Sequence, residues 1–188
     1  MDNLLNFLNS VYNISKEFRD RLWDTVQYSE LGIKTNLLFE RQICRNIYFV
    51  ESGLLRVFYK RDGKEISTSF ASEGELCSSF PSFFCQKYGR ERIQAIEDSC
   101  VWYISYDQYR TFINEFPEFA TICRVLLMKC QEVEETRMRA MWMQPAEARY
   151  KWLLNEWGDK FDRIPGKYIC SYMGFTNVML SRLRNGHA

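Results

Sequence analysis

The stretch NIYFVESGLLRVFYKRDGKEISTSF, residues 46–70, decides how the first half of this chain folds. It is rich in the aromatic and β-branched residues that favour strands, and it is interrupted at Ser52-Gly53 and again at Asp62-Gly63. An Asp-Gly pair between two such runs is typical of a tight β-hairpin. The stretch therefore predicts successive strands joined by short turns.

Strand-like segments continue beyond this stretch. Further short runs lie around residues 92–96 and 100–104. Several short strands with turn signals between them are typical of a β-sandwich or a β-roll. We therefore expect residues 34–104 to form a jelly-roll-like β-roll.

Helical periodicity flanks the predicted β-roll. Residues 2–30 have helical spacing, with Ser15 as a candidate N-cap. The apolar face of this region consists of Phe18, Leu22 and Val26. After the β-roll, Ser105 is the candidate N-cap of another helix, and Pro117 suits the first turn of the next one. The expected fold class is therefore α+β.

The helix that begins at Pro117 has apolar residues at alternating four- and three-residue steps. This is the a/d pattern of a coiled coil, so we expect the helix to join two copies of the chain into a homodimer. The predicted dimer seam consists of Phe119, Cys123, Leu126, Cys130, Val133 and Arg137. The alternative is a helix that packs on its own β domain.

Pro145 lacks an amide donor, so it must end this helix or begin another one. We place a domain boundary at this point. The predicted domains are a β-roll with flanking helices (residues 1–116), a dimerisation helix (117–143) and a small all-α domain (144–188).

The segment KYICSYMGFTNVMLSRLR, residues 167–184, has the features of a helix-turn-helix. Gly174 tolerates the positive φ of the turn, Cys170 is small enough for a helix crossing, and Thr176 is a natural N-cap for the second helix. The apolar anchors of the pair are Ile169, Met173, Phe175, Leu180 and Leu183.

The second helix of this pair presents a polar outward face. Its members are Asn177, Val178, Ser181, Arg182 and Arg184. Asn and Arg bond base edges in two places at once, and Val suits a thymine methyl group. We therefore predict that this helix reads the major groove of DNA, although a plain packed helical hairpin meets many of the same constraints.

The charge of the chain is unevenly distributed. Residues 1–136 hold 16 Lys and Arg against 20 Asp and Glu, whereas residues 137–188 hold 9 against 4. A basic C-terminal segment on an acidic body suggests that this segment meets a polyanion.

Little in the sequence suggests an enzyme or a metal site. The one histidine is His187, and no P-loop, G-x-S-x-G or G-x-G-x-x-G motif occurs, so we predict no catalytic residue. The seven cysteines are scattered without a C-x-x-C pair, so we predict no metal. No apolar run approaches the ~18 residues of a membrane span, and we see no signal peptide. We therefore expect a cytoplasmic protein.

These segments, in this order, resemble the Crp/Fnr family of bacterial transcription regulators over roughly residues 10–186. The family joins a cyclic-nucleotide-binding-type β-roll, a long dimer helix and a C-terminal helix-turn-helix. The most specific pieces are IYFVESGLLRVFYKRDGKEI (47–66), which looks like the family's hairpin pair, GEL (74–76), IQAIED (93–98) and GFTNVMLSRLR (174–184).

The resemblance implies a sequence-specific DNA-binding transcription regulator that reads an inverted repeat as a homodimer. RNA polymerase and an unidentified small-molecule effector are the further partners that it suggests. Matching the base-contacting positions residue by residue gives Asn177, Val178 and Arg182, and we expect Arg184 and Lys167 to contact phosphates. Family members usually continue into a β-wing, whereas only residues 185–188 follow here, so we expect a domain that lacks most of the wing.

The β-roll departs from the members that bind cyclic AMP. Those members have a Gly-Glu pair, a short helix and then Arg-Ser/Thr-Ala, whose arginine holds the phosphate. The candidate pocket residues are Gly74, Glu75, Arg90 and Arg92. In an alignment on Ala95, however, Gly89 replaces the arginine, and Arg90 and Arg92 should face away from the site. A buried phosphate without a paired cation is costly, so we do not expect cyclic AMP to bind in the usual way.

Other occupants of the β-roll remain open. One alternative is that the pocket holds a ligand with less charge than cyclic AMP. The other is that it is collapsed and filled by Phe80, Phe83 and Phe84, and packing in the core is the favoured role of these residues. The N-terminal cysteine cluster of the oxygen-sensing branch is missing, so we expect no iron–sulfur cluster.

Two other classes of function remain as alternatives. One is a ligand-binding or protein-interaction module whose helix pair docks on a protein partner. DNA binding that falls steeply with salt would exclude that module. The other is a metal-dependent enzyme on a similar β-roll, against which the lack of an internal histidine argues.

Overall fold

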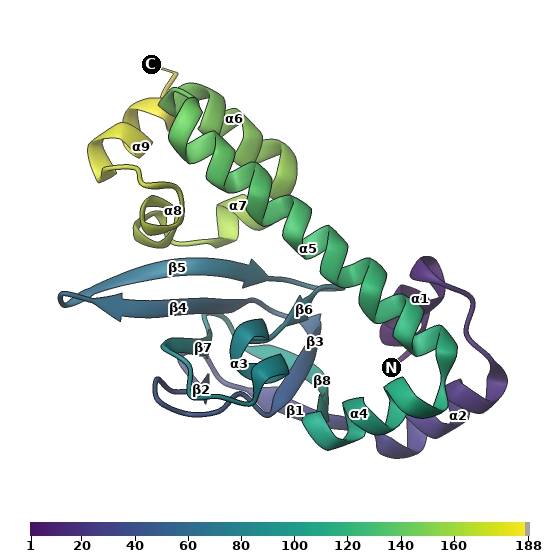
Figure 1. Cartoon of the computed structure of the whole chain (residues 1–188). Helices are drawn as coiled ribbons and strands as arrows, with labels where there is room; N and C mark the ends of the chain where they lie inside the picture. The colour runs from purple at the N-terminus through teal and green to yellow at the C-terminus, as the bar shows by residue number, and fades with distance from the viewer. Residues whose placement is uncertain (187–188) are drawn as a thin grey trace.

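Two four-stranded antiparallel sheets form the N-terminal half of the chain, and a long helix leads from them to a group of short helices (Figure 1). The computed structural model describes residues 1–186. One sheet has the strand order β1-β8-β3-β6 and the other β2-β7-β4-β5. The predicted α+β class with an N-terminal β-roll is confirmed.

The strands are β1 (Gln27–Leu31), β2 (Asn36–Leu38), β3 (Asn46–Ser52), β4 (Leu55–Arg61), β5 (Lys64–Ala71), β6 (Leu76–Cys77), β7 (Glu91–Ala95) and β8 (Ser99–Ser105). The helices are α1 (Asp2–Val11), α2 (Lys16–Thr25), α3 (Phe80–Cys85), α4 (Tyr106–Glu115), α5 (Pro117–Met143), α6 (Ala146–Trp157), α7 (Lys160–Arg163), α8 (Gly166–Met173) and α9 (Asn177–Arg184).

The core of the β-roll contains residues from every strand. Val50, Val57, Ile93 and Val101 come from four different strands, and all are fully or almost fully buried. They are β-branched residues, which pack well on pleated surfaces. The strand propensities read from the sequence therefore match the packing.

The β4–β5 hairpin forms at the predicted Asp-Gly pair. Arg61 pairs with Lys64, so Asp62 and Gly63 make a two-residue turn. Both residues have positive φ, 51° and 75°, as a type I′ turn requires.

The break at Ser52-Gly53 is a crossing between sheets. Strand β3 pairs with β6 and β8, whereas β4 pairs with β5 and β7, so β3 and β4 do not pair with each other. Gly53 has φ of 95°, and a Cβ there would lie 2.2 Å from Oγ of Ser99 and 2.6 Å from the carbonyl oxygen of Asp98. Only glycine fits this close approach of two chain segments.

The helical interpretation of residues 2–30 is wrong over its last part. The helix α2 ends at Thr25, and Gln27–Leu31 forms an edge strand on β8. Pairing with a distant strand overrides the local helical spacing there, because that spacing is only a weak preference. The predicted cap of α2 is confirmed, since the Ser15 side chain accepts a hydrogen bond from the backbone N–H of Phe18.

The first two helices after the β-roll, α4 and α5, begin where the sequence predicts. Ser105 caps α4 in a capping box with Gln108. The helix α5 then runs for 27 residues from Pro117 and stops before Pro145. Its first half packs on α1, α2 and α4, whereas its second half extends toward the C-terminal helices (Figure 1).

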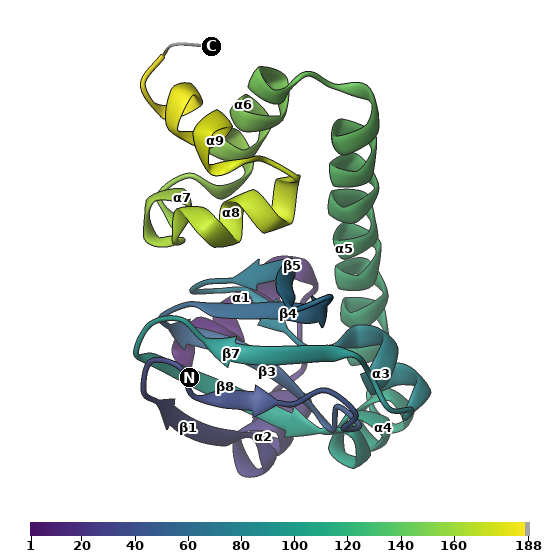
Figure 2. The ribbon, with the colours of Figure 1, turned by 90° about the vertical axis from the view of Figure 1, so that its left-hand side faces the viewer.

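The C-terminal helices share one apolar core with the β-roll. Leu54 and Phe70 of the β-roll are buried in the same cluster as the interior residues of α6 to α9. The ring of Phe70 lies 5.3 Å from that of Trp157 and 5.7 Å from that of Tyr172. Figure 2 shows α8 directly above the β4–β5 hairpin. The β-roll and the C-terminal helices are therefore packed together.

Ion pairs border this shared core. The Arg163 guanidinium donates to the carboxylates of Glu73 and Glu97 at 2.7 and 2.6 Å. The hydrogen bonds from Arg163 are the main reason why the pKa of Glu73 is lowered to about 2.

The lowered pKa of Glu73 makes the stability of the fold depend on acidity. Because this pKa is lower in the folded chain than in the unfolded one, the stabilisation is complete above about pH 5 and is lost as the pH falls toward 2. We expect the melting temperature to fall less steeply between pH 6 and pH 3 in Glu73→Gln than in the wild-type chain. Calorimetry checks this expectation, with Glu132→Gln, an exposed position on α5, as the control. Equal slopes in all three proteins would contradict it.

Candidate nucleic-acid interface

The helix pair α8–α9 forms at the predicted glycine turn. Gly174 has φ of 66°, in the left-handed region, and Phe175 after it is buried. The Thr176 side chain accepts a hydrogen bond from the backbone N–H of Met179 at 3.1 Å, which confirms it as the N-cap of α9. The predicted anchors Ile169, Met173, Phe175 and Leu180 are all buried, and Leu183 is half-buried.

The helix α9 presents its predicted reading face to solvent. Thr176, Asn177, Val178, Ser181 and Arg182 are all exposed, and Val178 is 62% exposed. A valine this exposed gains nothing from packing in the chain itself. This face therefore offers hydrogen-bonding groups and one apolar contact to an external partner.

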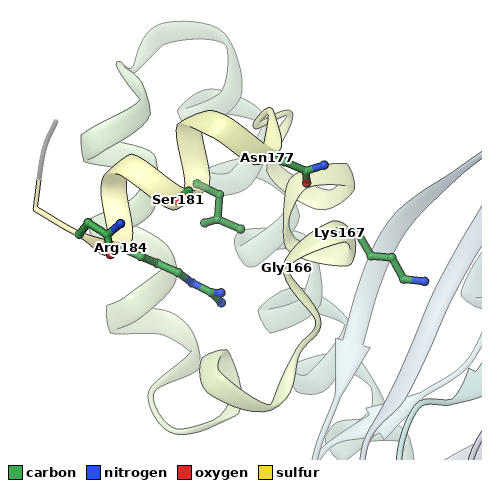
Figure 3. A pocket seen from close by; sticks show the side chains of 7 residues that line it. Gly166, Lys167, Asn177, Ser181 and Arg184 are labelled. Atoms are coloured by element: carbon green, nitrogen blue, oxygen red, sulfur yellow. The ribbon is translucent and has the colours of Figure 1, made fainter.

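A cavity of about 240 Å³ lies beside this face, between α9 and the start of α8 (Figure 3). Its lining consists of Gly166, Lys167, Asn177, Leu180, Ser181, Arg184 and Asn185. The polar side chains in this set include two cations and three uncharged groups that donate hydrogen bonds. Such a lining suits an oxygen-rich anionic group.

The two predicted phosphate contacts, Lys167 and Arg184, both line this cavity, but the charged end of Lys167 points away from Arg184. Figure 3 shows the Arg184 side chain extending from α9, whereas the Lys167 side chain points toward the strands of the β-roll. The guanidinium carbon of Arg184 lies 5.3 Å from the ring centre of Phe161. The Lys167 ammonium lies 4.8 Å from the Tyr168 ring, and its charge helps to lower the pKa of Glu65, after the larger effect of Arg56.

Two arginines that lie outside the predicted DNA-contacting set donate hydrogen bonds to the C-terminal end of α8. They stabilise the unit formed by α6 to α9 (residues 146–184), which we call the reading unit. Arg149 of α6 donates to the carbonyl oxygen of Met173 at 2.8 Å, and Arg137 of α5 donates to that of Tyr172 at 3.2 Å. The last carbonyls of a helix have no partner within it, so these bonds satisfy them. No spacing in the sequence reveals such contacts, because the paired residues lie 24 and 35 positions apart.

The placement of Arg137 and Phe119 corrects the predicted dimer seam. Arg137 turns into its own chain, where it also lies 4.6 Å from the ring of Tyr172. Phe119 is buried against Phe18 and Phe112 of its own domain, with ring centres 5.5 Å apart in each case. The a/d stripe failed at these positions because α5 packs on its own chain, as the alternative interpretation expected.

The burial of the other predicted seam residues varies along α5. Cys123 and Leu126 are half-buried against the same core as Phe119, Val133 is half-buried, and Cys130 is exposed. Large apolar side chains lie exposed elsewhere on this helix. They are Leu127, Met128, Met138, Trp142 and Met143.

Two of the predicted pocket residues, Glu75 and Arg92, have charged partners in the structure. The Glu75 carboxylate accepts hydrogen bonds from the Ser72 backbone N–H and from the Lys160 ammonium, both at 2.8 Å. Arg92 pairs with Glu40 at 3.5 Å, while Gly74 is half-buried and Arg90 is exposed.

A carboxylate lies where the sequence alignment places the phosphate-binding segment. Glu91 accepts hydrogen bonds from Ser79 at 2.6 Å and from Thr68 at 3.1 Å. Nearby, a Cβ on Gly89 would meet Ser82 at 3.2 Å, so a larger residue requires movement there.

The aromatic segment next to this site contributes to the core. Phe83 is fully buried, and its ring lies within 5.4 Å of the rings of Phe84, Tyr106 and Tyr109. Phe80 and Phe84 are half-buried. Packing was the favoured role for these phenylalanines, and the structure places Phe83 in that role.

Neither a metal cluster nor a membrane span is found in the part of the chain that the structure describes. Within residues 1–186, no three His, Cys, Asp or Glu side chains gather closely enough to hold a metal ion. None of the helices in this range combines the length and the apolar character needed to cross a bilayer.

Known proteins share this arrangement. The model of the cyclic nucleotide-binding domain family matches residues 32–116. A search of curated proteins finds no match. Among solved structures, a mutant of CooA from Carboxydothermus hydrogenoformans has 21% identity and a TM-score of 0.74, with coverage of 98% of this chain and 83% of that one.

Two further solved structures agree with these matches. FixK2 from Bradyrhizobium japonicum has 16% identity and a TM-score of 0.75, with coverage of 86% of this chain and 84% of that one. A transcriptional regulator of the Crp/Fnr family from Eubacterium rectale has 16% identity and a TM-score of 0.72, with coverage of 96% and 87%. Residues 32–116 therefore match the cyclic nucleotide-binding domain family, and the chain has the fold of the Crp/Fnr transcription regulators that its sequence resembles.

Proposed function

We propose that this protein is a sequence-specific DNA-binding transcription regulator that reads an inverted repeat as a homodimer. The observation that carries the proposal is the exposed polar face of α9 on a properly capped helix-turn-helix. The fold shared with the Crp/Fnr regulators supports it. In such proteins, two recognition helices enter successive major grooves about 34 Å apart.

The side chains of α9 suggest distinct roles in reading bases. Arg182 donates in two places to a guanine, and Asn177 bonds an adenine or a backbone group. Val178 packs on a thymine methyl group, and Ser181 adapts to either type of base pair. Arg184, beside the cavity between α8 and α9, neutralises a backbone phosphate. Lys167 contributes a second phosphate contact only if its side chain turns away from the β-roll.

The exposed apolar side chains of α5 support dimerisation. Leu127 and Met138 are eleven positions apart, which places them on one face of a helix with 3.6 residues per turn. Trp142 lies one turn further and is 83% exposed. Large apolar groups in such a row are typical of a surface that a partner covers. We propose that the partner is the same helix of a second copy.

The β-roll serves as a scaffold or senses a ligand other than cyclic AMP held in the usual way. The support is the set of charges in the predicted pocket. Glu75 is bonded to Lys160, and Glu91 places a negative charge in the segment that holds a phosphate in cyclic-AMP-binding relatives. A carboxylate in that position repels an anionic ligand.

The role of Arg182 can be tested by selecting bound DNA from a random duplex pool at physiological salt. We expect the wild-type chain to enrich an inverted repeat, and Arg182→Ala to lose preference at one position of each half-site, at a cost of about 1–3 kcal/mol. Arg110→Ala, on the exposed side of α4, is the matched control and should leave the selected site unchanged. If the wild-type chain enriches no sequence, the interaction-module alternative gains support.

The role of Arg184 predicts a different signature. Loss of one phosphate contact should weaken binding to all sequences alike and reduce the salt slope of log K by about 0.9 per subunit. Titrations of Arg184→Ala between 50 and 200 mM salt, on specific and unrelated duplexes, measure both effects. A variant that changes the preferred sequence but not the slope would assign Arg184 to base reading instead.

The proposed dimer helix can be tested by sedimentation. Leu127→Asp combined with Met138→Asp places two charges on the exposed apolar row, so we expect the dimer to dissociate at micromolar concentration. Lys129→Asp is the control, because it places an acidic group on another face of α5. Equal dissociation constants for wild type and the double variant would exclude this face as the dimer contact.

A further inference from the structure

The helix-turn-helix rests on the β-roll of its own chain through two short helices. Figures 1 and 2 both place α8 against the hairpin of β4 and β5, whereas α7 contacts the connections between strands. The link between α5 and α6 is short, and Gln144 and Pro145 in it are exposed. A joint of this kind permits rotation of the reading unit unless other contacts prevent it.

Cations of α7 hold the turns of both sheets. The Lys160 ammonium donates to both carboxylate oxygens of Glu75 at 2.8 Å, and its side chain is only 10% exposed. Arg163 donates to Glu73, to Glu97 and, at 3.1 Å, to the carbonyl oxygen of Gly53. These acceptors come from three separate connections between strands. The two cations therefore join the reading unit to several parts of the β-roll at once.

A buried arginine makes the second contact, under α8. The Arg56 side chain is fully buried, and its guanidinium lies 3.6 Å from the ring centre of Tyr168 and 4.2 Å from that of Phe58. It pairs with Glu65 at 2.8 Å. Ser171 of α8 bonds both the backbone N–H and the hydroxyl of Ser67 in β5. These groups require a defined orientation, because hydrogen bonds and ring contacts weaken when the angles change.

This docking leaves the reading face uncovered. The contacts with the β-roll come from Trp157 of α6, from α7, and from residues of α8 that include Tyr168, Ser171 and Tyr172. Asn177, Ser181 and Arg182 of α9 take no part in them and remain exposed. The docked state therefore fixes the direction of α9 without blocking it.

We propose that Lys160 and Arg163 are positioning residues for DNA reading. They hold α9 in one orientation before DNA arrives, so that binding does not have to order a freely rotating domain. This role rests on the proposed function. Preorganisation raises affinity by reducing the entropy lost on binding. Because the carboxylate partners lie on turns of the β-roll, any change in those turns alters the affinity for DNA.

The pair of Lys160 and Glu75 allows a charge-exchange test. The set consists of Lys160→Glu, Glu75→Lys and the double variant that exchanges the two charges, each assayed on the duplex that the wild-type chain selects. We expect each single change to lower affinity about tenfold and the exchange to restore most of it. Arg110→Glu on α4 is the control for a charge change far from the contact.

Simple attraction to DNA predicts another pattern. Glu75→Lys adds positive charge to the protein, so electrostatics alone would raise its affinity for DNA. A fall in affinity for this variant, with recovery in the exchanged pair, supports positioning. Unchanged or higher affinity in Glu75→Lys overturns the proposal, as does an exchanged pair that folds like wild type but does not recover.

A second measurement does not involve DNA. Hydrogen exchange of the backbone amides of α8 and β5 should accelerate in each single variant and return to wild-type rates in the exchanged pair. Uniform rates in all variants show that the ion pair does not hold the domains together, and this result also overturns the proposal. If the wild-type chain selects no DNA, the proposed function fails, while the exchange rates still decide whether the pair holds the docked state.

Discussion

The arrangement of this molecule depends on one apolar contact, in which Phe70 of β5 packs against Trp157 and Tyr172 of the C-terminal helices. Burial of a phenylalanine side chain stabilises a fold by about 1.5–3 kcal/mol, whereas an exposed ion pair contributes about 0–1 kcal/mol. The shared core therefore contributes most of the stabilising contact between the β-roll and the C-terminal helices. The partly exposed pairs of Arg163 supply direction, because they require particular carboxylates at particular turns.

Arginine has three different uses around this contact. Arg137 and Arg149 donate hydrogen bonds to the last carbonyls of α8. Arg137 also lies over the ring of Tyr172 and Arg149 over that of Phe175, so both stabilise the helix-turn-helix internally. Arg56 fills the interface with the β-roll as a buried cation between two aromatic rings. Arg182 alone among these four remains exposed on α9. The planar guanidinium suits all three uses, since it donates in several directions and stacks on rings.

In the β-roll, side chains in and near the predicted pocket contact other side chains of the same protein. Glu75 is bonded to Lys160, Glu91 to two hydroxyl groups, and Phe83 lies in an aromatic core. The pair of Glu75 and Lys160 connects the predicted pocket with the C-terminal helices.

The sequence by itself determined the features that depend on neighbouring residues. The type I′ turn at Asp62-Gly63, the caps at Ser15, Ser105 and Thr176, and the glycine turn at Gly174 all follow from local backbone preferences. Only the tertiary structure decided contacts between distant residues. It placed residues 27–31 in a strand and packed Phe119 and Arg137 against their own chain. It also paired the carboxylate of Glu75 with the ammonium of Lys160. Such contacts depend on which surfaces meet after folding, and an apolar or charged residue has the same local pattern whichever partner it finds.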